Sequence, residues 1–194
     1  MLFRSKAHMK SMLVAAGLPV GVYEVITDLQ WRTAKRHTLK RVKDLGFPVF
    51  VKPARAGSSV GITKVRDAER LEWAIEEARK HDPKVIVEAA IENNRELECG
   101  VLGTADGPRP SVVAEIVVRH GHEFYDFEAK YVDDSVDLVV PAKLPGSFTE
   151  DAQALACAAF DALGCEGLAR VDMFLAQGQL IINEVNTMPG FTPI

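Results

Sequence analysis

One stretch near the end of the chain restricts the fold more than any other, because it has the pattern of two strands joined by a tight turn. The segments GLARVDMFLA (167–176) and QLIINEVN (179–186) are apolar and β-branched, and only Gln177 and Gly178 separate them. A two-residue connection of this kind is typical of a β-hairpin, whose strands are antiparallel. The chain is therefore predicted to contain an antiparallel sheet.

The order of the remaining segments favours an α+β fold. Helical patterns are predicted at 5–16, 31–45, 67–80 and 147–163, and groups of strands lie between them, with DGPRP (106–110) as a turn before the strand 111–118. Because strands follow one another rather than alternate strictly with helices, we expect mostly antiparallel sheets with helices packed on one face of each. Two subdomains are expected, 1–90 and 91–194, with the boundary near residues 90–95.

Composition excludes several classes of protein. The net charge of −4 and the pI near 5.8 disfavour a nucleic-acid binder. No apolar run approaches the about 20 residues of a membrane span, and the first ten residues lack a signal-peptide pattern. The three cysteines form no C-x-x-C pair, which favours reduced, buried thiols and a cytoplasmic protein without nucleic-acid or membrane partners.

The hairpin also carries a regular set of polar residues. Because side chains alternate along a strand, Arg170 and Asp172 share one face of the first strand, and Glu184 and Asn186 share one face of the second. If Asp172 lies opposite Glu184, Arg170 lies opposite Asn186, but this pairing requires an odd-numbered turn or a bulge. Adjacent carboxylates with only oxygen ligands nearby suit Mg²⁺ rather than zinc. The other interpretation is a solvated sheet face, which such residues taken alone favour.

The segment VKPARAGSSVG (51–61) has the features of an anion-binding loop. Gly57, Ser58, Ser59 and Gly61 leave backbone N–H groups accessible, and Lys52 ends the preceding strand. It is not a Walker A motif, and on its own an ordinary Gly-Ser hairpin loop explains it better.

Two further segments carry candidate residues. Glu88 ends a buried strand and is placed to accept from an exocyclic amine such as that of adenine, and Glu96 to accept from sugar hydroxyls. Lys130 and Tyr131 lie in YDFEAKYVDD (125–134), an aromatic and charged stretch that is plausible as a lid. Solvated glutamates and an exposed hairpin with scattered ion pairs are the alternatives.

Taken in order, VKPARAGSSVG, VIVEAAI, RELEC, YDFEAKY, GLARVD and INEVNTMPG resemble the ATP-grasp superfamily, and within it the D-alanine–D-alanine ligase family. The resemblance runs over essentially the whole chain, and YDFEAKY and NEVNTMPGFT are its most specific parts. It implies the ATP-grasp fold, in which two α+β subdomains grip ATP.

The resemblance also implies a role for each matching residue. Lysines would contact the nucleotide and its phosphates, the Gly-Ser loop would close over the phosphates, and residues between Glu88 and Glu96 would hold adenine and ribose. The implied nucleotide-binding residues are Lys6, Lys52, Gly57, Ser58, Ser59, Glu88, Ala90, Ile91, Glu96 and Lys130. Asp172, Glu184 and Asn186 would bind two Mg²⁺ ions, with Mn²⁺ as a possible substitute. Arg170 and the backbone of Gly190 would face the developing oxyanion, and Ser58 and Tyr131 would orient the lid.

The implied reaction joins two D-alanine molecules through an acylphosphate at the expense of ATP, for peptidoglycan synthesis. A homodimer is common for such ligases. Family members carry a further N-terminal substrate domain that has no counterpart here, so the chain is expected to be incomplete at both ends. Two departures weaken the match locally, because Lys6 follows Arg4-Ser5 and Ala89 replaces a frequent lysine. An ATP-grasp ligase for another acid and amine, and a nucleotide-binding fragment without activity, remain as alternatives.

Overall fold

The computed structural model describes residues 5–57, 60–118 and 136–189. The chain divides into two compact units, the first formed by residues 1–8 and 21–90 and the second by residues 9–20 and 91–194. The division falls inside the first helix, α1 (Lys6–Ala15).

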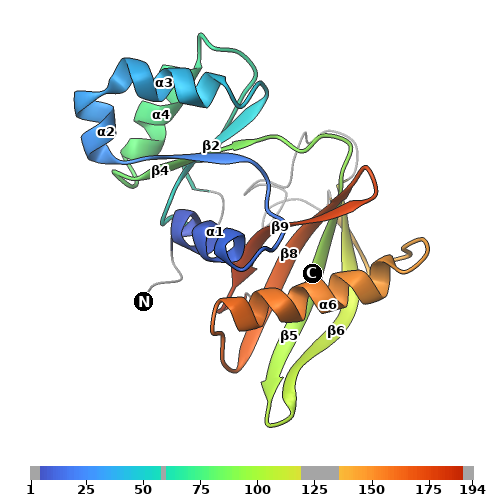
Figure 1. The fold of residues 1–194 in the computed structure, drawn as a ribbon. Helices are drawn as coiled ribbons and strands as arrows, with labels where there is room; N and C mark the ends of the chain where they lie inside the picture. Colours follow the sequence, from blue (N-terminus) through green and yellow to red (C-terminus); the bar gives the residue numbers. More distant parts are fainter. Residues whose placement is uncertain (1–4, 58–59, 119–135, 190–194) are drawn as a thin grey trace. The chain divides into compact units, whose positions relative to one another are not determined.

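The first unit is built on a four-stranded sheet with the order β1-β4-β2-β3, in which every neighbouring pair is antiparallel. Its strands are β1 (Tyr23–Ile26), β2 (Val49–Pro53), β3 (Thr63–Val65) and β4 (Val85–Ala89). Three helices belong to this unit, namely α2 (Asp28–Thr33), α3 (Lys35–Lys43) and α4 (Leu71–Arg79) (Figure 1). The core lies on one face of the sheet, where Val51 and Val87 pack with Leu71 and Ile75 of α4.

The helix predicted over residues 31–45 is wrong in its bounds, because two helices occupy this region. A capping box between Thr27 and Gln30 starts α2 earlier, at Asp28. Ala34, with φ −139°, then breaks the helical path before α3. The break allows α2 to bury Trp31 and α3 to bury Thr38 and Val42, each helix with its own orientation.

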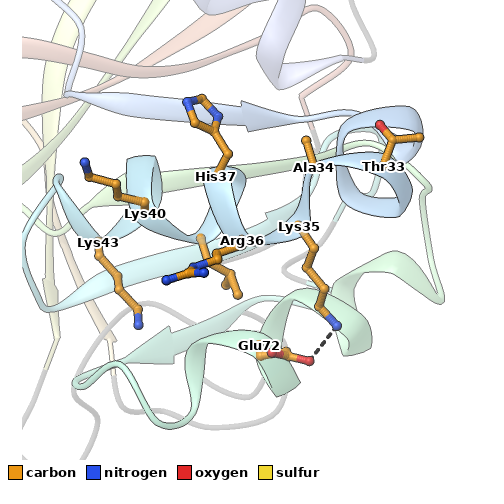
Figure 2. A pocket seen from close by; sticks show the side chains of 9 residues that line it. Thr33, Ala34, Lys35, Arg36, His37, Lys40, Lys43 and Glu72 are labelled. Atoms are coloured by element: carbon orange, nitrogen blue, oxygen red, sulfur yellow. Dashed lines mark ion pairs between the residues drawn. The ribbon is translucent and has the colours of Figure 1, made fainter.

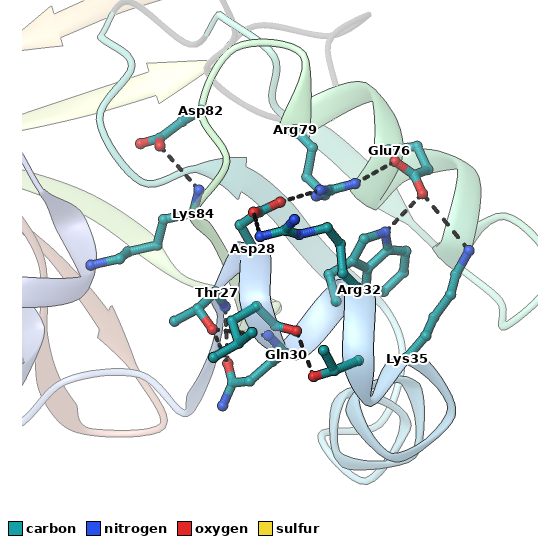
Figure 3. Close-up of polar contacts among 12 residues, drawn as sticks. Thr27, Asp28, Gln30, Arg32, Lys35, Glu76, Arg79, Asp82 and Lys84 are labelled. Atoms are coloured by element: carbon teal, nitrogen blue, oxygen red, sulfur yellow. Dashed lines mark hydrogen bonds and ion pairs between the residues drawn. The ribbon is translucent and has the colours of Figure 1, made fainter.

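Polar contacts fix α2 against α4 (Figure 3). Trp31 Nε1 donates to Glu76 Oε1 at 2.7 Å, and Arg79 joins Glu76 to Asp28 at 2.8 and 2.6 Å. The indole hydrogen bond is the main reason why the pKa of Glu76 lies below its usual value. A buried indole N–H needs such a partner, so this contact stabilises the position of Trp31.

The second unit contains a five-stranded antiparallel sheet with the order β7-β6-β5-β8-β9. Its strands are β5 (Arg95–Thr104), β6 (Gly107–Val118), β7 (Val136–Val139), β8 (Leu168–Ala176) and β9 (Gln179–Asn186). Helix α6 (Phe148–Ala162) lies along one face of this sheet and buries Ala152, Ala156 and Phe160 (Figure 1). The expected α+β class with mostly antiparallel sheets is confirmed.

The turn predicted at DGPRP is too long, because β6 already begins at Gly107. Pro108 and Pro110 pair with Gly103 and Val101 of β5, while β7 joins β6 only from Glu115 onward. Proline has no N–H to give to a second neighbour, and it is tolerated where a strand has a partner on one side only.

Residues 9–20 belong with the second unit, whereas the sequence placed them in a subdomain 1–90. The reason lies in contacts along β9. The Val185 N–H donates to Met9 Sδ at 3.2 Å, the Ile182 N–H donates to the Pro19 carbonyl at 2.9 Å, and Val20 forms a parallel bridge to Ile182. The role of the two units as ATP-grasp subdomains stays a prediction.

None of the helices in the described ranges is both long and apolar enough to cross a membrane.

Candidate active site

A β-bulge decides which side chains meet in the hairpin of β8 and β9. Gln177 and Gly178 have positive φ values of 51° and 74°, as a two-residue turn of the I′ type requires. From this turn the pairing is regular up to Met173 with Ile182, and then it shifts by one residue. Asn183 is the extra residue on β9, and beyond it Asp172 lies opposite Glu184.

The pairing that the sequence predicted is therefore confirmed, in its bulged form. Asp172 faces Glu184 and Arg170 faces Asn186. The alternate residues of β8, Val171 and Met173, are buried on the other face. If the same sequence paired regularly, with no bulge, Glu184 would lie opposite Val171, and Glu184 and Asn186 would point to that apolar face instead.

Three of the four polar side chains, those of Arg170, Asp172 and Asn186, are joined by hydrogen bonds. Arg170 donates from Nε and Nη2 to the two oxygens of Asp172, at 2.7 and 2.8 Å. Asn186 Nδ2 donates to Asp172 Oδ2, also at 2.8 Å. Asp172 is thus the centre of a small network that ties β8 to β9, and charge-assisted forks of this kind hold their geometry well.

A fifth member of this patch, Glu98, was missed in the sequence. Strand β5 pairs with β8 so that Glu98 lies opposite Asp172, and its Oε1 is 3.2 Å from Arg170 Nη2. The period of two along RELEC places Glu96 and Glu98 on one face, which is a signal that could have drawn attention to both. It could not show that β5 would lie beside β8.

Glu98, Asp172 and Glu184 form one row across three neighbouring strands, which we call the carboxylate row. One guanidinium, that of Arg170, contacts two of its members. Among the residues that the structure describes, no three His, Cys, Asp or Glu side chains are grouped so that they could hold a metal ion. The predicted ligand set has two carboxylates and one amide, so this finding does not test it.

In the first unit, the structure brings Lys52 and Glu88 together as an ion pair. Both side chains lie on the sheet face opposite the main core, with 14% and 8% of their surface exposed. Lys52 Nζ also lies 5.5 Å from the centre of the Phe50 ring. Binding of phosphate by Lys52 and adenine by Glu88, as predicted, would require this pair to open.

The other described nucleotide residues have their own contacts. Lys6 Nζ donates to the Ala56 carbonyl at 2.9 Å, and the Val60 N–H donates to the Gly57 carbonyl at 3.1 Å. The Ala90 N–H donates to the Pro48 carbonyl at 2.9 Å, which leaves the carbonyl of Ala90 as its available group for adenine.

The Ile91 carbonyl accepts from the Asn94 side-chain amide. Glu96 lies on β5 opposite Phe174 of β8. The remaining predicted residues, Ser58, Ser59, Lys130, Tyr131 and Gly190, lie outside the described residues.

A separate hollow of about 970 Å³ lies in the first unit, along α3 (Figure 2). Its lining is mainly basic, and Lys35 is paired there with Glu72 at 2.5 Å. The residues that line it are Thr33, Ala34, Lys35, Arg36, His37, Leu39, Lys40, Lys43 and Glu72. No motif in the sequence predicted this hollow, although KRHTLKRVK (35–43) is a basic stretch. A lining with a single carboxylate is unsuited to a divalent cation.

All three cysteines are free thiols, as the sequence predicted. Burial raises the pKa of each, which favours the protonated thiol. Cys99 is buried, but Cys157 and Cys165 are only partly so, which corrects the expectation of three buried thiols.

Comparison with known proteins agrees with the resemblance seen in the sequence. A family model described as "D-ala D-ala ligase C-terminus" matches residues 12–194. The chain belongs to the D-alanine–D-alanine ligase family. Two curated family members named D-alanine–D-alanine ligase, from Streptomyces coelicolor and Pseudarthrobacter chlorophenolicus, are 54% and 56% identical over 98% and 97% of the chain.

Solved structures of ligases share the fold. The VanG D-Ala:D-Ser ligase from Enterococcus faecalis superposes with a TM-score of 0.84 at 38% identity, over 98% of this chain and 54% of that one. The D-alanine–D-alanine ligase from Coxiella burnetii gives a TM-score of 0.82 at 30% identity, over 100% and 49%. The chain spans about half the length of the curated relatives that it matches. The ATP-grasp fold expected from the resemblance is confirmed.

Proposed function

We propose that this chain provides the ATP-binding and catalytic part of a ligase that joins two D-alanine molecules through an acylphosphate. The observation that carries the proposal is the pairing of Asp172 with Glu184 across the bulge, in a chain of this family. A row of carboxylates on one sheet face is unfavourable by itself and becomes favourable when a cation lies between its members.

The donor set of the hairpin fits a hard divalent cation. Asp172, Glu184 and Asn186 supply oxygen atoms on the same face of the sheet. We assign these three residues to one or two Mg²⁺ ions, with Mn²⁺ as a substitute. Such ions, when bound, neutralise the charge on phosphoryl oxygens.

The proposed reaction has two steps. A carboxylate oxygen of the first D-alanine attacks the γ-phosphorus of ATP, the bond to the β-phosphate oxygen breaks, and ADP leaves. The amine of the second D-alanine then attacks the acylphosphate carbon, loses a proton, and expels inorganic phosphate as the peptide bond forms. Negative charge grows first on phosphoryl oxygens and then on a carbonyl oxygen.

Several residues of this chain would stabilise that charge, and others would hold the nucleotide. Lys52, released from Glu88, binds a phosphate oxygen, and Glu88 then accepts from the adenine amine. Lys6 and the loop at Gly57 bind near the phosphates, and Glu96 accepts from the ribose. Arg170 stabilises the oxyanion at the carbonyl carbon. For Ser58, Ser59, Lys130, Tyr131 and Gly190 we keep the roles given by the resemblance.

The second substrate is the least constrained element of the proposal. The VanG ligase, which has the same fold in this region, is a D-Ala:D-Ser ligase by name. A ligase that joins D-alanine to another amino acid is therefore the second candidate, and the two differ only in the amine that is accepted.

The experiment measures ADP release with and without D-alanine. The protein is this chain joined to the part of the Streptomyces coelicolor relative that the match leaves uncovered, and the chain alone is measured in parallel. We expect ADP release to depend on D-alanine and to fall at least about tenfold in Glu184→Gln, which removes one ligand charge. D-serine and D-lactate are offered as second substrates to separate the two candidates.

If the rate of ADP release is the same with and without each amino acid, the ligase proposal is overturned. For the chain alone, calorimetric titration with Mg-ATP tests nucleotide binding. Binding without turnover by the joined protein would favour a nucleotide-binding fragment.

A further inference from the structure

Asp172 has two competing tasks if it is a metal ligand. Both of its oxygens accept hydrogen bonds from Arg170, and Oδ2 also accepts from Asn186. An ionised carboxylate has about two lone-pair sites on each oxygen, so these two donors occupy Oδ2. A divalent cation that binds both oxygens of Asp172 must therefore displace at least part of the fork to Arg170.

A displaced Arg170 would be a cation beside a divalent cation, which is a costly arrangement unless another anion holds it. We propose that Glu98 is the positioning residue that receives Arg170 when Asp172 turns to the metal. This inference rests on the proposed function, because it gives Asp172 the role of metal ligand.

The geometry makes the exchange short. Glu98 Oε1 is 3.2 Å from Arg170 Nη2, the same nitrogen that donates to Asp172 Oδ2. Glu98 and Asp172 are direct cross-strand partners on one sheet face. The guanidinium can therefore move from one carboxylate to the other by side-chain rotation, without a shift of either strand.

The neighbouring position on β5 favours the same movement. Gly100 is the residue opposite Arg170, so no side chain stands between Arg170 and β5 at that level of the sheet. Glu98 is 18% exposed and Arg170 is 29% exposed. An ion pair that is largely shielded from water holds a defined position better than a surface pair does.

Mn²⁺ affinity of this chain, measured by electron paramagnetic resonance of the free ion, gives the first test. Glu98→Gln removes the charge, while Glu98→Asp keeps the charge but is one methylene too short to hold Arg170. We expect both variants to bind Mn²⁺ about tenfold more weakly than the wild type, which corresponds to about 1.4 kcal/mol.

Glu115→Gln is the matched control. Glu115 accepts a fork from Arg95 in the same sheet, at 2.7 and 2.6 Å, but it lies outside the carboxylate row. Its replacement should leave the Mn²⁺ affinity within about twofold of the wild type, because the charge near the proposed site is unchanged.

The side chain of Arg170 gives a second, direct readout. Its ¹⁵Nε–¹H resonance, assigned by its loss in Arg170→Gln, should stay ordered when Mg²⁺ is added to the wild type. In Glu98→Gln and Glu98→Asp the Arg170 side chain should become mobile on addition of Mg²⁺, because the carboxylate that would receive it is missing or out of reach.

The outcomes separate this inference from the function on which it rests. Wild-type protein that binds no Mn²⁺, or that binds it unchanged after Asp172→Asn, overturns the metal assignment and this inference together. If Asp172→Asn abolishes binding while Glu98→Asp matches the wild type in affinity and in Arg170 order, only the positioning role of Glu98 is overturned.

Discussion

The polar faces of the two sheets differ in how their charges are arranged. In the first unit, Lys52 and Glu88 form an ion pair in a mostly buried position. In the second unit, three carboxylates lie in a row across neighbouring strands, and the guanidinium of Arg170 contacts two of them. The first arrangement joins one cation to one anion, whereas the second gathers three anions on one sheet face.

The difference indicates two kinds of site. A buried ion pair must open before a ligand can use either partner. A row of carboxylates on one face is held in place by the sheet and the bulge, and a cation from solution would reduce the repulsion between its members. Substitutions that change one side of this contrast should have distinct effects, which we give from the largest to the smallest.

The largest effect is expected from Glu184→Gln in the second unit. Loss of one carboxylate should weaken Mn²⁺ binding by on the order of a hundredfold, since ligand charge sets the affinity of oxygen sites. The measurement is a Mn²⁺ titration of the chain followed by electron paramagnetic resonance. Glu150→Gln, in the first turn of α6, is the control and should have no effect. Equal affinities for the wild type and Glu184→Gln would mean that the row is an ordinary solvated face.

Lys52→Ala should mainly affect the stability of the first unit. It removes the ammonium that is paired with the Glu88 carboxylate, which we expect to lower the free energy of unfolding by about 2 kcal/mol. Urea denaturation gives this value. The double variant Lys52→Met/Glu88→Leu should recover most of the stability, because an apolar pair of similar size needs no compensation.

The double variant also separates a structural role of Lys52 from a role in nucleotide binding. If Lys52 serves the nucleotide as well, restored stability should not restore Mg-ATP affinity in calorimetry. Recovery of both would reduce Lys52 to a structural residue.

Asp82→Asn should have the smallest effect, and that effect should depend on pH. Burial by itself raises the pKa of Asp82, but hydrogen bonds from Arg55 and from the Lys84 N–H, with the charge of Arg55, outweigh it and bring the pKa below 3.8. A lowered folded-state pKa contributes stability above the unfolded value, and this contribution is lost as the pH falls through the folded-state pKa.

Thermal unfolding at several pH values checks this expectation. The variant should have a Tm about 3 °C below that of the wild type at pH 7, and this difference in Tm should become smaller below pH 3.8. A gap that stays constant into acid would show that the ion pair with Arg55 is not its cause.

Local patterns in the sequence were sufficient to predict the hairpin. The period of two along β8 and β9 fixed which residues share a face, and the two-residue turn showed that the Asp172–Glu184 pairing needed a bulge. The fold class followed from the order of the elements, and the family from motifs spread over the chain.

Contacts between distant segments were beyond this reasoning. Glu98 joins Asp172 because β5 pairs with β8, some seventy residues later, and no local pattern specifies that neighbour. The same holds for the contact of Lys52 with Glu88. The division of the predicted helix at Ala34 follows from the burial of Trp31 against α4, and the strand through Pro108 and Pro110 follows from the short reach of β7.

The extra residue at Asn183 also determines which length changes the hairpin can accept. A chain that lost one residue between Gln179 and Asn183 could pair regularly along β9 and still place Glu184 opposite Asp172, because the deletion would remove the bulge. A chain that gained one residue there would need a second bulge, or the side chains beyond the insertion would change faces. Among natural variants of this hairpin, single deletions should therefore outnumber single insertions.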